Sequence, residues 1–268
     1  MHPSPPAALT IAGSDCSAGA GIQADLKTFQ HFGVHGLTAV TCVVSETANV
    51  VRMVHPVPPG VLEDQMALLL ESFPIAAIKT GMLYSADHIG VVIDCLSRFP
   101  AIAVVVDPVM ISSTGTPLLE PAAMAILREE LLPLASLVTP NLHEAEALAS
   151  ESIQSSDDLE RIALLLSSRY GVPFLVKGGH LDSPDCTDLL AANGHLHHFT
   201  APRIALPGSH GTGCTLSAAI AANLALGLPL AEAVSRAKHY LTRTLEQSYS
   251  FPSPTGGSVH ALNQGTAF

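Results

Sequence analysis

The chain has 268 residues, 48% of them hydrophobic and 13% charged, which supplies a large core of mainly aliphatic side chains. Its formal net charge of -11 argues against nucleic acid as a partner, because phosphate backbones are bound by basic patches. The five cysteines have no C-x-x-C spacing, the start of the chain is unlike a signal peptide, and no apolar run reaches membrane length. These features predict a cytoplasmic protein without disulfides or a membrane span.

Apolar runs and helical patterns alternate along the chain. The predicted strands are residues 8–12, 37–44, 75–78, 102–106, 137–138 and 174–176, followed by a hairpin of residues 188–192 and 196–199 around Asn193-Gly194. The predicted helices are residues 22–32, 59–73, 86–99, 121–132, 143–149, 157–170, 214–226 and 230–246. This alternation predicts one α/β domain over residues 1–268, with a mostly parallel sheet covered on both faces. Residues 1–7 and 251–268 are expected to be loop or tail.

Polar or glycine-rich motifs follow six of the predicted strands. They are Gly13-Ser14-Asp15, Ser45-Glu46, Lys79-Thr80-Gly81-Met82, Asp107-Pro108-Val109-Met110, Thr139-Pro140-Asn141 and Lys177-Gly178-Gly179-His180. In open parallel sheets, ligands bind at the carboxyl ends of the strands. The six motifs therefore predict a single site along one edge of the sheet.

A glycine-rich turn over residues 208–214 leads directly into a helix of small apolar residues. Gly211, Thr212 and Gly213 carry little bulk, so the N–H groups and the positive end of the helix dipole can approach an anion closely. The turn therefore predicts a phosphate cradle, although an ordinary loop before a buried helix has the same pattern. Cys214 lies in the first helical turn, where a thiolate is favoured, and is a candidate base or nucleophile.

Two carboxylates and a lysine are candidates for the remaining parts of a phosphoryl-transfer site. Asp107 and Glu144 could hold Mg²⁺ directly or through water, since this ion uses few protein carboxylates. Glu144 could equally be an acidic residue of a first helical turn, and Lys177 either a phosphate ligand or a solvated lysine. Together with the phosphate cradle these residues predict phosphoryl transfer, and the missing G-x-x-x-x-G-K-[ST] pattern excludes a P-loop enzyme.

Seven segments in order resemble the hydroxymethylpyrimidine/phosphomethylpyrimidine kinases of thiamin synthesis, within the ribokinase-like superfamily. They are residues 8–15, 20–29, 79–83, 107–110, 139–145, 177–180 and 210–219. The resemblance implies a three-layer α/β/α sandwich with eight to ten strands, ATP and Mg²⁺ as cofactors, and a homodimer. It also implies two successive phosphorylations, of 4-amino-5-hydroxymethyl-2-methylpyrimidine and then of its monophosphate.

The resemblance also implies roles for individual residues. The pyrimidine would be lined by Gly13, Asp25, Glu46, Met82, Val109 and Cys214. The catalytic anion hole would comprise Gly211, Thr212, Gly213 and Cys214, with the thiol beside the acceptor hydroxyl as base or positioning group. ATP would meet Lys177, Asn141, Asp107 and His210, and Mg²⁺ would meet Glu144 and Asp107.

Glu46 departs from the family pattern, which usually has glutamine at this position. A carboxylate accepts a hydrogen bond from the pyrimidine amino group but donates to a ring nitrogen only when one partner is protonated. Pyridoxal/pyridoxine kinases of the same subfamily also vary here, so pyridoxal phosphorylation is the alternative function. A non-catalytic pyrimidine-binding protein is a further alternative, against which the intact loop from Gly211 to Cys214 argues.

Overall fold

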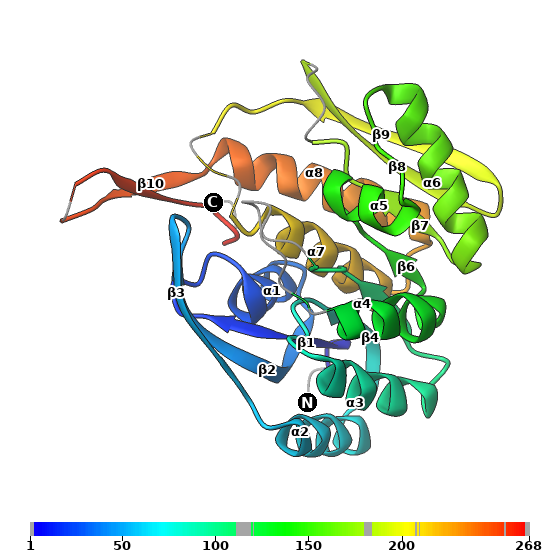
Figure 1. The fold of residues 1–268 in the computed structure, drawn as a ribbon. Helices are drawn as coiled ribbons and strands as arrows, with labels where there is room; N and C mark the ends of the chain where they lie inside the picture. Colours follow the sequence, from blue (N-terminus) through cyan, green and yellow to red (C-terminus); the bar gives the residue numbers. More distant parts are fainter. Residues whose placement is uncertain are drawn as a thin grey trace.

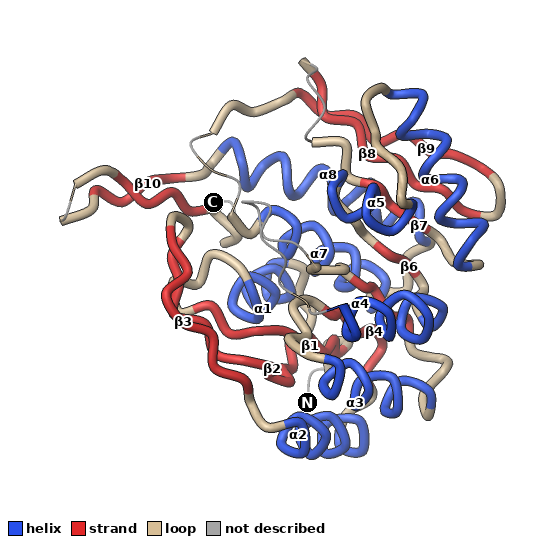
Figure 2. The backbone as a smooth tube through the Cα atoms, in the orientation of Figure 1, coloured by secondary structure: helices blue, strands red, loops and turns tan. Residues whose placement is uncertain are grey.

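The computed structural model describes residues 3–110, 119, 121–179, 184–206, 208, 210–254 and 256–265. Its strands form a nine-stranded sheet of order β3-β2-β1-β4-β5-β6-β7-β8-β9 and a separate pair, β10-β11 (Figures 1 and 2). The strands are β1 (Ala7–Asp15), β2 (His35–Thr47), β3 (Val50–Pro56), β4 (Ile75–Thr80), β5 (Ala103–Val106), β6 (Leu137–Val138), β7 (Phe174–Val176), β8 (Asp185–Ala192), β9 (His195–Pro202), β10 (Tyr249–Pro252) and β11 (Ser258–Ala261).

The centre of the large sheet is parallel and its edges are antiparallel. Strands β2, β1, β4, β5, β6 and β7 run in one direction, whereas β3, β8 and β9 pair antiparallel with their neighbours. The predicted α/β class with a mostly parallel sheet is confirmed. Parallel neighbours place all their carboxyl ends at one edge, which is where the predicted motifs meet.

Helices cover both faces of the sheet, as the three-layer prediction requires. They are α1 (Gly21–His31), α2 (Pro59–Ser72), α3 (Ala86–Ser97), α4 (Pro121–Ile126), α5 (Leu142–Ala149), α6 (Ser156–Tyr170), α7 (Thr212–Ala225) and α8 (Leu230–Glu246). One core packs α2 to α6 against the sheet, and the other packs α1, α7 and α8 against the opposite face. No helix in the described ranges is both long and apolar enough to cross a membrane.

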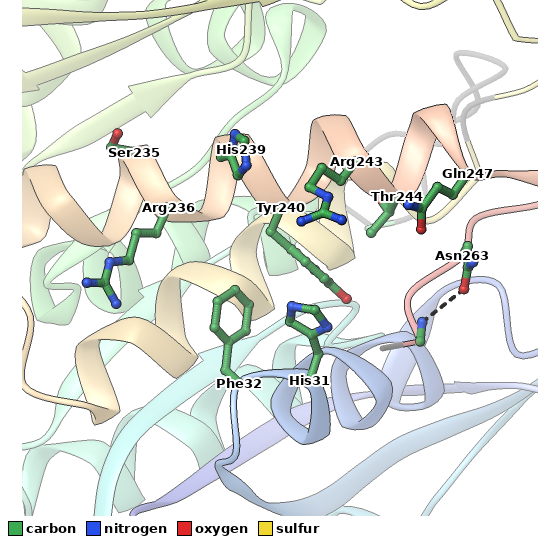
Figure 3. A pocket seen from close by; sticks show the side chains of 11 residues that line it. His31, Phe32, Ser235, Arg236, His239, Tyr240, Arg243, Thr244, Gln247 and Asn263 are labelled. Atoms are coloured by element: carbon green, nitrogen blue, oxygen red, sulfur yellow. Dashed lines mark hydrogen bonds between the residues drawn. The ribbon is translucent and has the colours of Figure 1, made fainter. Parts of the chain in front are cut away.

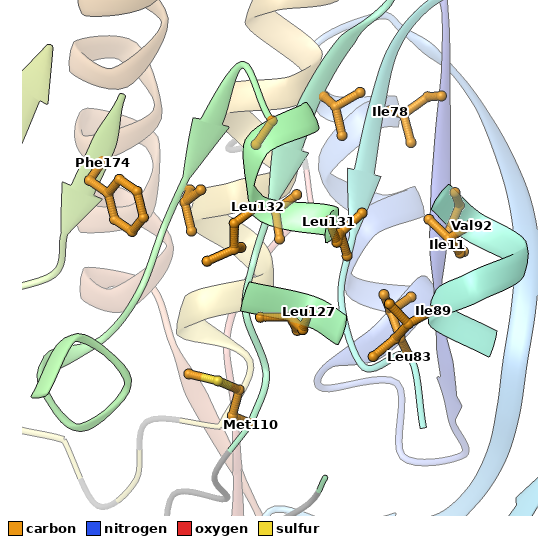
Figure 4. Packing of buried hydrophobic residues seen from close by; sticks show 14 of the residues in the cluster. Ile11, Ile78, Leu83, Ile89, Val92, Met110, Leu127, Leu131, Leu132 and Phe174 are labelled. Atoms are coloured by element: carbon orange, nitrogen blue, oxygen red, sulfur yellow. The ribbon is translucent and has the colours of Figure 1, made fainter. Parts of the chain in front are cut away.

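Alternation along the strands divides side chains between the two cores. Ala7, Leu9 and Ile11 of β1 belong to the core under α2 to α6, whereas Ala8, between Ala7 and Leu9, belongs to the other. Figure 4 shows side chains of the first core, among them Leu127 and Leu131 from the turn after α4 and Ile11 from β1. Successive strand side chains point to opposite faces, so the continuous apolar runs of the sequence serve two cores at once.

Helix α7 is buried on nearly all sides by the sheet, α1 and α8. Its residues Ala218, Ala219, Ala221 and Ala222 are fully buried, and such small side chains let a helix lie close to its neighbours. Its first two turns lie beside Asp107, since the hydroxyl of Ser217 donates to that carboxylate over 3.3 Å. The packing therefore brings the start of α7 to the carboxyl edge of the sheet.

The helix predicted over residues 121–132 ends early. After α4 the chain forms a π-helical turn at Leu127–Leu131 and then a 3-10 turn at Leu132–Leu134. Pro133 has no N–H for the carbonyl four residues before it, and its ring crowds that carbonyl. The proline therefore changes the hydrogen-bond pattern before the predicted end of the helix.

Three strands lie where the sequence predicts none. Strand β3 pairs with β2 as the edge of the large sheet and exposes most of its residues, so it lacks a buried apolar pattern. The loop predicted for residues 251–268 is wrong in part, because β10 and β11 form an antiparallel hairpin. Tyr249 and Phe251 favour extended backbone, and Pro252 is tolerated because the hairpin ladder ends there.

Candidate active site

The loop between β1 and α1 is organised by one carboxylate. Asp15 accepts hydrogen bonds from the backbone N–H groups of Ser17 (2.7 Å), Gly19 (3.0 Å) and Ala20 (2.8 Å). It also accepts from Nε2 of His210 at 3.0 Å. Burial alone would raise the pKa of Asp15, but these hydrogen bonds hold it well below its usual range. The bond to Asp15 in turn raises the pKa of His210, and the hydrogen bond joins loops 195 residues apart.

The glycine turn before α7 packs directly against that first loop. Gly211 has a φ of +82°, and a Cβ atom there would lie 1.9 Å from the carbonyl oxygen of Gly19. The first intrahelical bond runs from the N–H of Thr215 to the carbonyl of Gly211 at 2.9 Å, which leaves the amides of the first turn outside the helical ladder. The structure thus places Thr212 and Gly213 at a helix start suited to an anion.

The surroundings of Cys214 oppose the thiolate that its place at a helix start predicts. Burial, with smaller contributions from Asp25 and Asp107, raises the pKa of Cys214 to about 11 against the opposing effects of Lys79 and the Gly21 backbone. At pH 7 only about one thiol in 10⁴ is then ionised. The helix start favours the thiolate, but burial and the two carboxylates disfavour it more strongly.

A fully buried ion pair lies beside Cys214. Nζ of Lys79 is 2.8 Å from Oδ2 of Asp25, and the hydroxyl of Thr10 donates to the same oxygen over 2.6 Å. Burial alone would lower the pKa of Lys79, but the Asp25 carboxylate raises it above its ordinary value. Oδ1 of Asp25 and the hydroxyl of Thr80 are buried without a hydrogen-bond partner among the described residues. Both therefore have unused hydrogen-bonding capacity.

Glu46 lies on β2 next to the Asp15–His210 pair. One potential ligand atom from each of the three residues falls within 4.8 Å of the other two. Burial, and then the charge of Asp15, raise the pKa of Glu46 despite the opposing effect of His210. This environment favours the protonated carboxyl group, which can donate as well as accept a hydrogen bond.

A second charged centre follows β5, β6 and β7. Lys177, whose side chain is 14% exposed, lies 3.0 Å from Oδ1 of Asp107, and Ser217 donates to the other carboxylate oxygen. Asn141 and Glu144 form a reciprocal capping box at the start of α5, with bonds of 2.8 and 2.9 Å. Burial raises the pKa of Glu144 to about 7, with Asp107 adding to and Lys177 opposing the shift.

The start of α7 lies between the two centres. A Cβ atom on Gly213 would be 3.3 Å from Nζ of Lys177 and 3.6 Å from Oδ2 of Asp107. The charges of Asp25 and Lys79 both shift the pKa of its neighbour Cys214. One helix turn thus connects a buried acid–lysine pair with a second pair that is accessible from the edge.

Three predicted pocket residues are less clearly placed. Gly13 faces β2, because a Cβ atom there would lie 2.9 Å from the sulfur of Cys42. Met82 and Val109 are half-buried, and the Met82 carbonyl accepts from the hydroxyl of Thr41. Their contact with a pyrimidine stays a prediction.

No individual role was predicted for Lys79 or Asp15. Each belongs to a strand-end motif, and a lysine directly after an apolar run is the available signal for Lys79. Its partner Asp25 is 54 residues away, so only the fold reveals the pair.

The fold agrees with that of solved kinase structures. A pyridoxal kinase of Bacillus subtilis in complex with ADP matches with a TM-score of 0.87 and 36% identity, covering 96% of this chain and 97% of the other. A phosphomethylpyrimidine kinase of Clostridium difficile matches with a TM-score of 0.79 and 37% identity, covering 88% and 98%. The chain has the fold of these vitamin kinases.

Sequence comparison identifies one family among these vitamin kinases. A family model described as phosphomethylpyrimidine kinase matches residues 15–258. The hydroxymethylpyrimidine/phosphomethylpyrimidine kinase of Synechococcus elongatus is 42% identical over 95% of this chain and 97% of its own length. The bifunctional thiamine biosynthesis protein of Geobacter sulfurreducens is 41% identical over 95% of this chain, which spans only 52% of that longer protein. The chain belongs to the phosphomethylpyrimidine kinase family.

Proposed function

We propose that this protein transfers the γ-phosphate of ATP to 4-amino-5-hydroxymethyl-2-methylpyrimidine and then to the resulting monophosphate. The observation that carries the proposal is the start of α7 between two charged centres, one enclosed and one at the edge. Phosphoryl transfer depends mainly on positioning and charge neutralisation, which such a helix start provides for the migrating group. The family membership and the named relatives support the same reaction.

The second centre is the proposed site of ATP and Mg²⁺. Asp107 and Glu144 share one cation, Lys177, so the buried group carries more carboxylates than positive charges. Buried carboxylates favour a compensating cation, and Mg²⁺ takes oxygen ligands of this kind directly or through water. Lys177 and the α7 amides would contact phosphate oxygens, Asn141 would lie beside them, and Mg²⁺ would neutralise phosphate charge when bound.

The enclosed centre is the proposed pyrimidine site. Oδ1 of Asp25 can accept from the amino or hydroxymethyl group, and the Thr80 hydroxyl can donate or accept. A protonated Glu46 would present both a donor and an acceptor to the aminopyrimidine edge, as the glutamine of relatives would. In this proposal the thiol of Cys214 positions the acceptor hydroxyl and does not take up its proton.

A second candidate is phosphorylation of pyridoxal, favoured by the close likeness to the Bacillus subtilis pyridoxal kinase. Coupled ADP release separates the candidates when hydroxymethylpyrimidine, its monophosphate and pyridoxal are supplied in parallel. We expect turnover of both pyrimidines, and a higher pyrimidine-to-pyridoxal ratio of kcat/KM in Glu46→Gln, because an amide always offers a donor. Turnover of pyridoxal alone would overturn the main proposal.

The assembly is proposed to be a homodimer in the cytoplasm. Val51 and Met53 of β3 and Phe251 of β10 are 56%, 64% and 58% exposed, which is unusual for large apolar side chains and suits a second copy. All five cysteines are unpaired, as expected in a reducing compartment. Light scattering of the purified chain should give twice the chain mass, and a monomer at micromolar concentration would contradict the dimer.

A further inference from the structure

A cavity of about 400 Å³ lies between the end of α1 and the side of α8 that faces it (Figure 3). Arg236, His239, Tyr240 and Arg243 line it from α8, while His31 lies opposite them. Among the described residues, no aspartate or glutamate lines this cavity, although acids outnumber lysine and arginine by 23 to 12 in the chain. The lining therefore suits a negatively charged molecule.

Arg243 is the cation best placed to bind such a molecule. Within the described part of the chain it has no hydrogen bond or carboxylate partner, whereas Arg236 pairs with Glu232 at 3.1 Å on the exposed surface. Nδ1 of His31 is also buried in this wall without a described partner. Guanidinium groups bind phosphate and carboxylate with paired hydrogen bonds, so an uncommitted one beside a cavity is a ready anion ligand.

An aromatic wall stands next to these polar groups. The rings of His31 and Phe32 lie 4.4 and 5.0 Å from that of Tyr240, measured between centroids. Ring faces and edges of this kind pack against a planar ligand. A volume of this size also falls in the range of pockets for small molecules.

We propose that this cavity is a second ligand site, which binds a small aromatic anion such as an aryl or heteroaryl phosphate. Arg243 holds the anionic group, His31 offers its Nδ1 atom, and the ring cluster packs against the planar part.

The wall of the cavity is continuous with the active site through Gln264. Its neighbours Asn263 and Gly265 line the cavity, and its own carbonyl accepts from the Tyr240 hydroxyl over 2.9 Å. The Gln264 amide nitrogen donates to the carbonyl of Gly19 (3.2 Å) and to the hydroxyl of Thr215 (3.0 Å). Gly19 belongs to the loop held by Asp15, and Thr215 follows Cys214. A ligand that fixes residues 263–265 therefore also restrains both loops of the active site.

The first test is calorimetric titration of the full chain with phenyl phosphate. Saturating hydroxymethylpyrimidine and a non-hydrolysable ATP analogue are kept present to fill the active site. We expect one phenyl phosphate per chain, with inorganic phosphate and phenol each binding much more weakly. Arg243→Gln should weaken binding by about tenfold or more, and the matched control Arg161→Gln, on the exposed face of α6, should not.

Lack of binding to the wild-type chain, or equal loss in Arg161→Gln, would overturn the site. Binding that Arg243→Gln leaves unchanged would also overturn it. Because the titration does not measure phosphoryl transfer, its failure is distinguishable from a failure of the proposed function. A thermal unfolding curve matching wild type would show that Arg243→Gln is folded.

The second test is amide hydrogen exchange at residues 17–21, with and without phenyl phosphate. Binding should slow exchange in this loop of the wild-type chain, and Gln264→Ala should abolish the slowing while phenyl phosphate still binds. Exchange that phenyl phosphate does not change in the wild-type chain would overturn the connection through Gln264.

Discussion

Lys79 and Lys177 each stand at the end of a parallel strand, and each is held by a carboxylate from elsewhere in the chain. The partner of Lys79 is Asp25 on α1, at 2.8 Å, and the partner of Lys177 is Asp107 after β5, at 3.0 Å. Buried ion pairs contribute little net stability, but removing one partner leaves an uncompensated charge. Both lysines are thus fixed in place before any substrate binds.

Asp25→Asn should destabilise the protein by about 3 kcal/mol or more, because it leaves the buried Lys79 ammonium without its counter-charge. The double variant Asp25→Asn, Lys79→Met should recover most of that loss, measured by urea unfolding. Hydroxymethylpyrimidine binding should stay weak in both, since the free carboxylate oxygen is gone. Recovery of binding along with stability would show that Asp25 acts only in the core.

Glu144 should make stability depend on pH. Its pKa is about 7 in the folded chain against an ordinary 4.5, so the unfolded state loses its proton first as pH rises. The wild-type chain should therefore lose about 3 kcal/mol relative to Glu144→Gln between pH 4.5 and 7, and nothing further above pH 7. Urea unfolding at several pH values measures this difference. A difference that is constant from pH 5 to 8 would contradict the raised pKa.

Cys214 provides a test of how the acceptor hydroxyl is activated. If the thiol remains protonated, log kcat should be nearly level between pH 8 and 10, and Cys214→Ser should keep the same profile. A thiolate acting as the base would instead raise kcat about tenfold per pH unit toward pH 11, because its ionised fraction grows at that rate. Such a rise, present in the wild type and absent in Cys214→Ser, would restore the base assignment.

At the scale of elements, two glycine loops interlock at the start of α7, the proposed phosphate site. The β1–α1 loop is folded around Asp15, and the turn before α7 lies against it where Gly211 approaches the carbonyl of Gly19. His210 then binds Asp15 across the contact. The position of the α7 amides therefore depends on a loop near the opposite end of the chain.

Gly211→Ala should reduce kcat by about 100-fold or more, because a Cβ atom would collide with the Gly19 carbonyl and displace the turn. Gly227→Ala is the matched control, with the same φ of +82° and no atom within 4 Å of the added carbon. Backbone strain should cost each variant about 1 kcal/mol of stability, and the collision should cost Gly211→Ala more, but only Gly211→Ala should lose activity. Equal activity losses would mean that strain alone, and not the loop contact, matters.

Most elements of the fold could be predicted from the sequence because their apolar patterns reflect burial. Central strands such as β5 and β7 are continuous apolar runs, and α7 is a run of small residues after glycines. The exposed edge strand β3 and the hairpin of β10 and β11 lack this signal. The site residues lie where the strand-end motifs indicate, but their pairing is set by contacts distant in the sequence.

Cys214 shows the limit of local reasoning about charge. Its place at a helix start favours ionisation, whereas its pKa is decided by burial and by Asp25 and Asp107, which come from α1 and the end of β5. The raised pKa values of Glu46 and Glu144 likewise depend on neighbours from other loops. Residue type and position along the chain therefore predict which residues are candidates for the site, but they do not predict the pKa values of these residues.

At the scale of the whole molecule, one sheet separates two cores and gathers the chemistry at one edge. Parallel strands supply the charged residues, and α7 reaches that edge because its small side chains fit closely between α1 and α8. In the proposed function, the enclosed centre holds the heteroaromatic acceptor, and the second centre holds the nucleotide with its metal ion. The arrangement suits repeated transfer to the same kind of acceptor.

The most direct test of the proposed function is to follow phosphorus NMR spectra of the purified chain with MgATP and hydroxymethylpyrimidine. A pyrimidine monophosphate signal should appear first and then decline as the diphosphate signals grow, with two ATP consumed per pyrimidine. Cys214→Ser should show the same order of products. ADP formation without any pyrimidine phosphate, or a monophosphate that accumulates and is never converted, would contradict the account.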